Sequence, residues 1–133
     1  LTDFGAAAAG AADLAGDLAR RIGARPVLVH VLPQVSVPQS WRPRAEAAMK
    51  RNTAVAHQRL GAAMAPLERY GPVESVIIQG NIAEGVADLA RTRRAGLIVM
   101  GLERGGTGPR PGSTAYPVIC SAPVPVLAVP AKG

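Results

Sequence analysis

The chain has 133 residues, 48% hydrophobic and 18% charged, which fits one folded domain over residues 1–133 and excludes an intrinsically disordered chain. Its formal net charge is +6, but the arginines are scattered and aromatic residues make up only 3% of the chain, so we expect no nucleic-acid partner. The single cysteine, Cys120, cannot form an internal disulfide, and no apolar run reaches the length of a membrane span, so we expect a cytoplasmic protein without a membrane partner.

The first expected element is an Ala-rich helix that ends at Gly23. Leu14, Leu18 and Ile22 recur every four residues along it beside Ala7, Ala11 and Ala15, which is typical of an amphipathic helix. A strand over residues 27–32 follows, flanked by prolines. Because this strand is apolar at both alternating sets of positions, it indicates burial on both faces and favours a parallel sheet.

Residues 34–43 contain prolines and predict a loop. A long helical pattern then extends to Gly71. Its apolar stripe consists of Met49, Ala56, Leu60, Met64 and Leu67. The basic residues near its other side are interpreted as a solvent-exposed face.

The second half of the chain continues the alternation of strands and helices. A strand over 73–79 is followed by Asn81 and Glu84, which resemble a capping box at the start of a helix. A strand over 97–101, a helix that begins at Ser113 and a last strand over 126–129 complete the order. This alternation predicts an α/β fold with right-handed crossovers, in which ligands bind at the carboxyl ends of the strands.

The segment after Gly101 is rich in glycine and proline up to Ser113. A junction of strand, Gly-rich loop and helix start directs backbone N–H groups and the positive end of a helix dipole to one place, which favours phosphate binding. Pro109 and Pro111 have no N–H to donate, but Arg104 or Arg110 could supply charge instead. No lysine lies in this loop, so the Walker A pattern is absent.

Taken together, these segments resemble the universal stress protein family over nearly the whole chain. The resemblance rests on Asp3, Val29-His30-Val31, Gln79-Gly80-Asn81, Leu97-Ile98-Val99-Met100-Gly101, Gly112-Ser113 and Ala122-Pro123-Val124-Pro125-Val126. It implies a Rossmann-like, open, doubly wound five-stranded parallel sheet in the order 3-2-1-4-5, with helices on both faces. It also implies a homodimer through the last strand, Val126 to Val129, and in one branch a bound ATP or AMP, with Mg2+ accompanying ATP.

The resemblance also implies roles for single residues. In the nucleotide-binding branch Asp3 contacts the nucleoside, the backbone of Val31 meets the adenine, and the end of the fourth strand borders the site. The Gly-rich loop and the following Gly-Ser hold the phosphates. The expected nucleotide-binding residues are therefore Asp3, Val31, Met100, Gly101, Arg104, Gly105, Gly112, Ser113 and Thr114. Arg104 stands where that branch has a glycine, and the interval from Gly101 to Gly112 is shorter than in its pattern.

Leu1 stands where the first strand of the family finishes, and that strand lies in the middle of the sheet. A gap there would leave unpaired backbone on both neighbouring strands. We therefore expect that most of this first strand lies outside the given sequence, and that a strand preceding Leu1, another segment or a second subunit fills the place.

Two functions follow from the resemblance. The first is a regulatory module of the stress response that binds an adenine nucleotide and acts as a dimer. The alternative is a dimerisation or interaction module of the same fold that binds no nucleotide. An enzyme is not expected, because the sequence shows no positioned base or P-loop lysine. His30 and His57 are interpreted as structural residues rather than metal ligands, and capping of the first helix is a competing role for Asp3.

Overall fold

The computed structural model describes residues 1–103 and 115–132. Its elements in chain order are α1 (Ala6–Ile22), β1 (Val27–Leu32), the 3-10 helix η1 (Gln39–Trp41), α2 (Arg42–Met64), the 3-10 helix η2 (Ala65–Tyr70), β2 (Glu74–Gln79), α3 (Ile82–Thr92), β3 (Ile98–Leu102), α4 (Ala115–Ser121) and β4 (Val126–Pro130). The expected alternation of helices and strands is confirmed. No helix within the described ranges is long and apolar enough to cross a bilayer.

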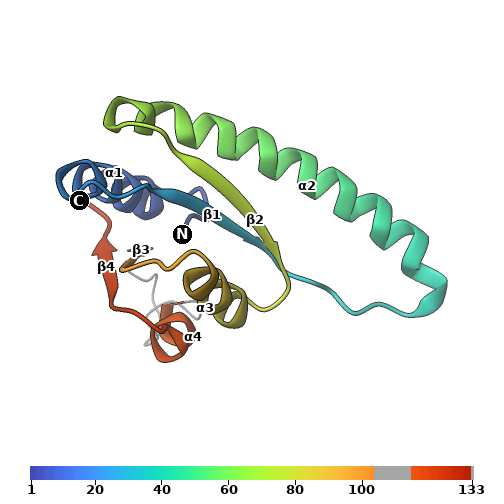
Figure 1. The fold of residues 1–133 in the computed structure, drawn as a ribbon. Coiled ribbons are helices and arrows are strands. Elements are labelled where there is room, and N and C mark those ends of the chain that lie inside the picture. Colours follow the sequence, from blue (N-terminus) through green and yellow to red (C-terminus); the bar gives the residue numbers. More distant parts are fainter. Residues whose placement is uncertain (104–114, 133) are drawn as a thin grey trace.

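The strands form two separate two-stranded parallel sheets, β1 with β2 and β3 with β4. Val29 lies opposite Val76 in one sheet, and Met100 lies opposite Ala128 in the other. The expected order 3-2-1-4-5 counts a central first strand before α1, so β1, β2, β3 and β4 correspond to its strands 2, 3, 4 and 5. The two observed pairs are those that this order places on either side of the central strand. The amino terminus of the chain lies between the two pairs (Figure 1). A single five-stranded sheet stays a prediction, because the place of its central strand holds only the start of the chain.

The helices pack on both strand pairs. α1 contacts β3 and β4, α2 contacts β1 and β2, and α3 packs against α4 and β2. In Figure 1, α1 and α2 lie above the strands, whereas α3 and α4 lie below them. One apolar core forms around α3, α4 and β3, and a second forms where β1 meets α2 and η2.

Local signals explain where the helices begin and end. The side chain of Asn81 accepts a hydrogen bond of 3.1 Å from the backbone N–H of Glu84, so the predicted cap of α3 is confirmed. Gly23 ends α1 with a left-handed φ of 69°, a conformation that glycine adopts without steric cost. The expected long helix changes to a 3-10 helix at Ala65, because Pro66 lacks an N–H and cannot continue the α-helical bonding.

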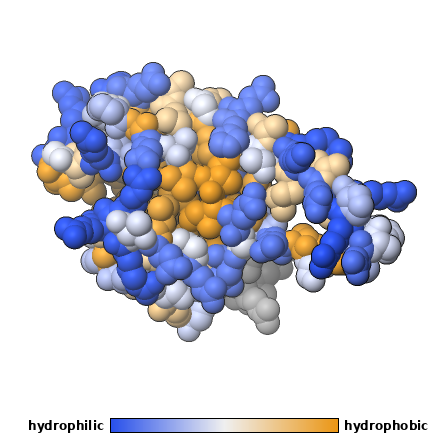
Figure 2. Space-filling view, turned by 45° about the vertical axis from the view of Figure 1, so that its right-hand side comes forward, coloured by the Kyte–Doolittle hydropathy of each residue, from blue (hydrophilic) through white to orange (hydrophobic). Residues whose placement is uncertain are grey.

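The buried side of α1 agrees with the expected one at its alanines but not at Leu14 and Ile22. Leu14 is 41% exposed and Ile22 is 66% exposed, whereas Ala7, Ala8 and Ala11 are buried. Small residues allow the helix backbone to approach β3 closely, so alanine rather than leucine faces the core at this contact. On the face shown in Figure 2, apolar side chains gather in the middle and hydrophilic ones surround them.

Candidate functional site

The first residues of the chain bridge the two strand pairs. The α-amino nitrogen of Leu1 donates a hydrogen bond of 2.9 Å to the carbonyl oxygen of Val99 in β3. The backbone N–H of Thr2 donates one of 2.7 Å to the carbonyl oxygen of Val29 in β1. Successive residues of a strand direct their backbone groups to opposite neighbours, so Leu1 and Thr2 follow the path of a central strand. They bring Asp3 to the carboxyl ends of β1 and β3.

A tight turn connects this segment to α1. Phe4 has a positive φ of 67°, and its N–H donates to Oγ1 of Thr2 at 3.0 Å. The N–H of Gly5 donates to Oδ1 of Asp3 at 2.8 Å. Gly5 is the N-cap of α1 and makes no side-chain cap bond. Asp3 therefore organises the turn before the helix instead of capping it directly, and an ionised carboxylate has further acceptor sites for a ligand.

His30 fixes the position of the same segment. Its Nδ1 lies 2.8 Å from the carbonyl oxygen of Thr2, and a carbonyl can only accept, so Nδ1 carries the proton. The ring also packs against Phe4, with ring centroids 4.3 Å apart. The guanidinium of Arg59 lies over the ring of Phe4, 5.8 Å from its centroid. This bonding agrees with the structural role expected for His30.

A second carboxylate lies beside Asp3. A Cβ atom built on Gly5 would lie 2.8 Å from Oε1 of Glu103 and 3.0 Å from Oδ1 of Asp3, so both side chains reach the same glycine. Glu103 follows β3 directly. Glu103 was not among the predicted site residues, because it belongs to none of the motifs that carry the resemblance. Its place just after a strand was the one signal that could have identified it.

The remaining described residues of the expected site have different environments. Val31 is half-buried in β1, and alternation along the strand directs its backbone to the same edge as that of Val29. Met100 is 4% exposed and packs in the core around α3 and α4, so its side chain is directed away from a ligand. Gly101 has the backbone of α1 directly against it. The structure thus brings Asp3, Val31 and Gly101 to one end of the strands.

The residues that were expected to bind the phosphates are not described by the structure. Arg104, Gly105, Gly112, Ser113 and Thr114 all lie outside the described residues. Within 1–103 and 115–132, no group of three or more His, Cys, Asp and Glu residues could hold a metal ion. What the described residues offer a ligand is a pair of carboxylates, backbone groups at two strand ends and the positive charge of Arg59 nearby.

Comparisons with known proteins agree on one family. A model of the Universal stress protein family matches residues 1–130. The chain is 21% identical to the universal stress protein UspA from Lactobacillus plantarum, with a TM-score of 0.79 over 92% of this chain and 89% of that one. It is 19% identical to a universal stress protein solved in complex with cAMP, with a TM-score of 0.70 over 98% of this chain and 93% of that one. No curated protein matches.

A third solved structure is that of the universal stress protein from Archaeoglobus fulgidus in complex with dAMP. It is 21% identical to this chain, with a TM-score of 0.65 over 97% of this chain and 90% of that one. At such identities, the likeness shows a shared α/β fold.

Proposed function

Because the chain belongs to the universal stress protein family, we propose that it is a regulatory module that binds an adenine nucleotide, ATP or AMP, and acts as a dimer in a stress response. The observation that carries the proposal is the meeting of Asp3 and Glu103 at Gly5, where two strands of a parallel α/β fold end. Two similar structures contain cAMP and dAMP, and both ligands are adenine nucleotides.

The charge of the site suggests how such a ligand would lie. Carboxylates accept hydrogen bonds from hydroxyl and amino groups, so Asp3 and Glu103 suit a ribose or the amino group of adenine. The same carboxylates repel phosphate, which therefore lies away from them. Arg104 follows Glu103 in the sequence and is the first candidate for the phosphate. If ATP binds, Mg2+ comes with it, held mainly by phosphate and water oxygens.

We propose a binding role and not a catalytic one. The Gly-rich loop has no lysine of the P-loop kind, and Asp3 is engaged in the turn before α1. The cytoplasmic location stays an expectation from the sequence.

Thermal unfolding with increasing ATP, AMP or cAMP tests the proposal. A ligand at about 100 times its Kd stabilises the folded state by about 2.7 kcal/mol, which raises the melting temperature by several degrees. Asp3→Asn and Glu103→Gln each weaken binding, by about 10-fold or more, because a charged acceptor is lost. Asp88→Asn, an exposed α3 carboxylate paired with Arg91, serves as the matched control and leaves binding unchanged.

The alternative is a dimerisation module that binds no nucleotide. It is favoured by the exposure of Leu127 on β4, which pairs with β3 alone among the described strands. If millimolar adenine nucleotides leave the melting temperature unchanged while the chain is dimeric, the alternative holds and the proposed nucleotide site is wrong.

A further inference from the structure

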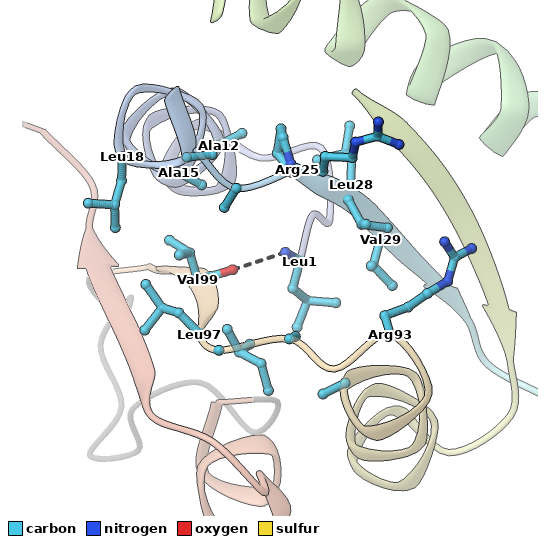
Figure 3. Close-up of a pocket in the computed structure, with 18 of the residues that line it drawn as sticks. Leu1, Ala12, Ala15, Leu18, Arg25, Leu28, Val29, Arg93, Leu97 and Val99 are labelled. Carbon is cyan, nitrogen blue, oxygen red and sulfur yellow. Dashed lines mark hydrogen bonds between the residues drawn. The ribbon is translucent and has the colours of Figure 1, made fainter. Parts of the chain in front are cut away.

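The first half of α2 projects from the body of the domain. It extends beyond the ends of β1 and β2 (Figure 1), and the buried residues of α2, Ala56 and Leu60, both lie in its second half. We call residues 41–55 the arm. The arm does not line the cavity of about 540 Å³ between the two strand pairs (Figure 3), which is the place of the expected central strand. Its surface is therefore independent of how that place is filled.

The arm is strongly basic. Arg42, Arg44, Lys50 and Arg51 are exposed along it against the single carboxylate of Glu46, so four positive charges and one negative charge leave a net +3. The ion pairs among the described residues all lie elsewhere, so these four cations have no carboxylate partner. The first turn of α2 contains no acidic residue, and the helix dipole disfavours positive charge there. Helix stability therefore does not account for this charge.

The only tryptophan of the chain lies on the same side of the arm as two of the cations. The backbone of Trp41 is in the αR region, so it continues the path of α2. Arg44, Arg51 and Val55 follow Trp41 at helical spacing, which places the four side chains along one side over about 21 Å. Trp41 is 59% exposed and Val55 47% exposed, and both arginines are exposed, so this side faces solvent.

The chemistry of this side favours a single-stranded nucleic acid. Such a strand offers a phosphate and an aromatic base at every nucleotide, arginine binds the phosphate, and tryptophan stacks on the base. A membrane surface is disfavoured, because Arg44 and Arg51 interrupt the apolar residues and an interfacial helix needs a continuous apolar face. The expectation of no nucleic-acid partner rested on arginines scattered over the whole chain and on few aromatic residues. In the fold, the only tryptophan stands on a basic arm.

We propose that the arm binds single-stranded nucleic acid, with a base stacked on Trp41 and phosphates bound by Arg44 and Arg51. This site is separate from the proposed nucleotide site, since neither Asp3 nor Glu103 belongs to the arm. An oligothymidylate contains no adenine, so it probes the arm independently of the proposed function.

The test titrates the 133-residue chain with an oligothymidylate of about 12 nucleotides at about 50 mM salt. Trp41 is the only tryptophan, so its fluorescence reports on the arm directly. We expect saturable quenching as bases stack on the indole, and the same quenching in excess AMP. The logarithm of the binding constant should fall against the logarithm of the salt concentration with a slope of about −3, because four phosphate contacts contribute about 0.7 each.

Variants are compared by the fluorescence anisotropy of a labelled oligothymidylate. Trp41→Ala weakens binding by about 5- to 150-fold, because a stacked base is lost, and Trp41→Tyr restores most of it. Arg44→Gln combined with Arg51→Gln reduces the salt slope by about 1.4. Arg20→Gln combined with Arg25→Gln removes the same charge near the start of β1 and leaves binding unchanged. Circular dichroism equal to that of the parent chain shows that α2 stays helical in each variant.

Several results would overturn the proposal. Oligothymidylate could leave the fluorescence of Trp41 unchanged, or AMP could displace it, which would place the oligonucleotide in the nucleotide site. Polyglutamate offers charge without bases, and equal competition at equal charge would identify an acidic protein as the partner. A blue shift of the Trp41 emission with vesicles of anionic phospholipid, but no response to oligothymidylate, would identify a membrane surface. Equal weakening in the Arg20 and Arg25 control would mean that net charge alone governs binding.

Discussion

A Cβ atom built on Gly101 would lie 2.5 Å from the backbone nitrogen of Ala8, closer than real Cβ atoms come to a neighbouring backbone. The backbone of α1 therefore rests directly on β3 at this glycine. The contact places the start of α1 beside the end of β3, and with it the turn from Asp3 to Gly5. Gly101, which the family resemblance places at the border of a nucleotide site, thus also has a packing role.

Gly101→Ala is expected to destabilise the fold by about 1–3 kcal/mol, because the added methyl group meets backbone that cannot rotate away. Urea unfolding measures the change. Gly10→Ala in α1 is the matched control, since a Cβ atom at Gly10 meets nothing within 4 Å. The control is expected to stabilise the helix by about 0.5–1 kcal/mol. Equal stability of the two variants would contradict the close contact of α1 with β3.

Elements with a local signal could be predicted from the sequence. Asn81 and Glu84 marked the start of α3, and Gly23 marked the end of α1, because caps depend on neighbours along the chain. The buried side of α1 was less predictable. Periodicity places Leu14 and Ala11 in the same apolar pattern, but which of the two is buried depends on how closely β3 approaches the helix. That distance is set by Gly101, far along the chain.

The candidate site was also predictable only in part, because it depends on contacts between residues that lie far apart in the chain. Asp3 could be assigned through the family resemblance, since it precedes the first helix. Its meeting with Glu103 depends on the docking of α1 on β3, which no sequence motif encodes. The stacking of Phe4 on His30 likewise joins residues from the chain start and from β1.

The carboxyl group of Asp13 is expected to titrate at a higher pH in Tyr70→Phe. A hydrogen bond of 2.8 Å from the Tyr70 hydroxyl is the main cause that lowers the pKa of Asp13 below 3.8, and Arg69 adds to it. A lowered carboxyl pKa stabilises the fold above the unfolded pKa, and this stabilisation is lost as the pH falls through the folded value. Loss of the hydroxyl moves the midpoint of Asp13 upward, which carbon-detected NMR titration measures.

The control in that experiment is Glu74, whose pKa is lowered mainly by a hydrogen bond from Arg93 and not by Tyr70. The titration midpoint of Glu74 should be the same in both proteins. An unchanged midpoint for Asp13 would mean that Arg69 alone sets the pKa of this carboxyl group.

If the chain forms the proposed dimer, Leu127→Glu is expected to shift it from dimer to monomer. β4 pairs with β3 alone among the described strands, and Leu127 is 38% exposed on it, so this edge is the candidate interface of the proposed dimer. A twofold interface contains each residue twice, and each buried leucine contributes about 1.5–3 kcal/mol, so the dimer Kd should increase at least 100-fold. Sedimentation equilibrium measures the change.

The control for this prediction is Val55→Glu. Val55 is 47% exposed on α2, so the variant adds the same charge away from β4 and should leave the dimer intact. If both variants dissociate the dimer equally, added charge and not the β4 edge governs association, and the interface lies elsewhere.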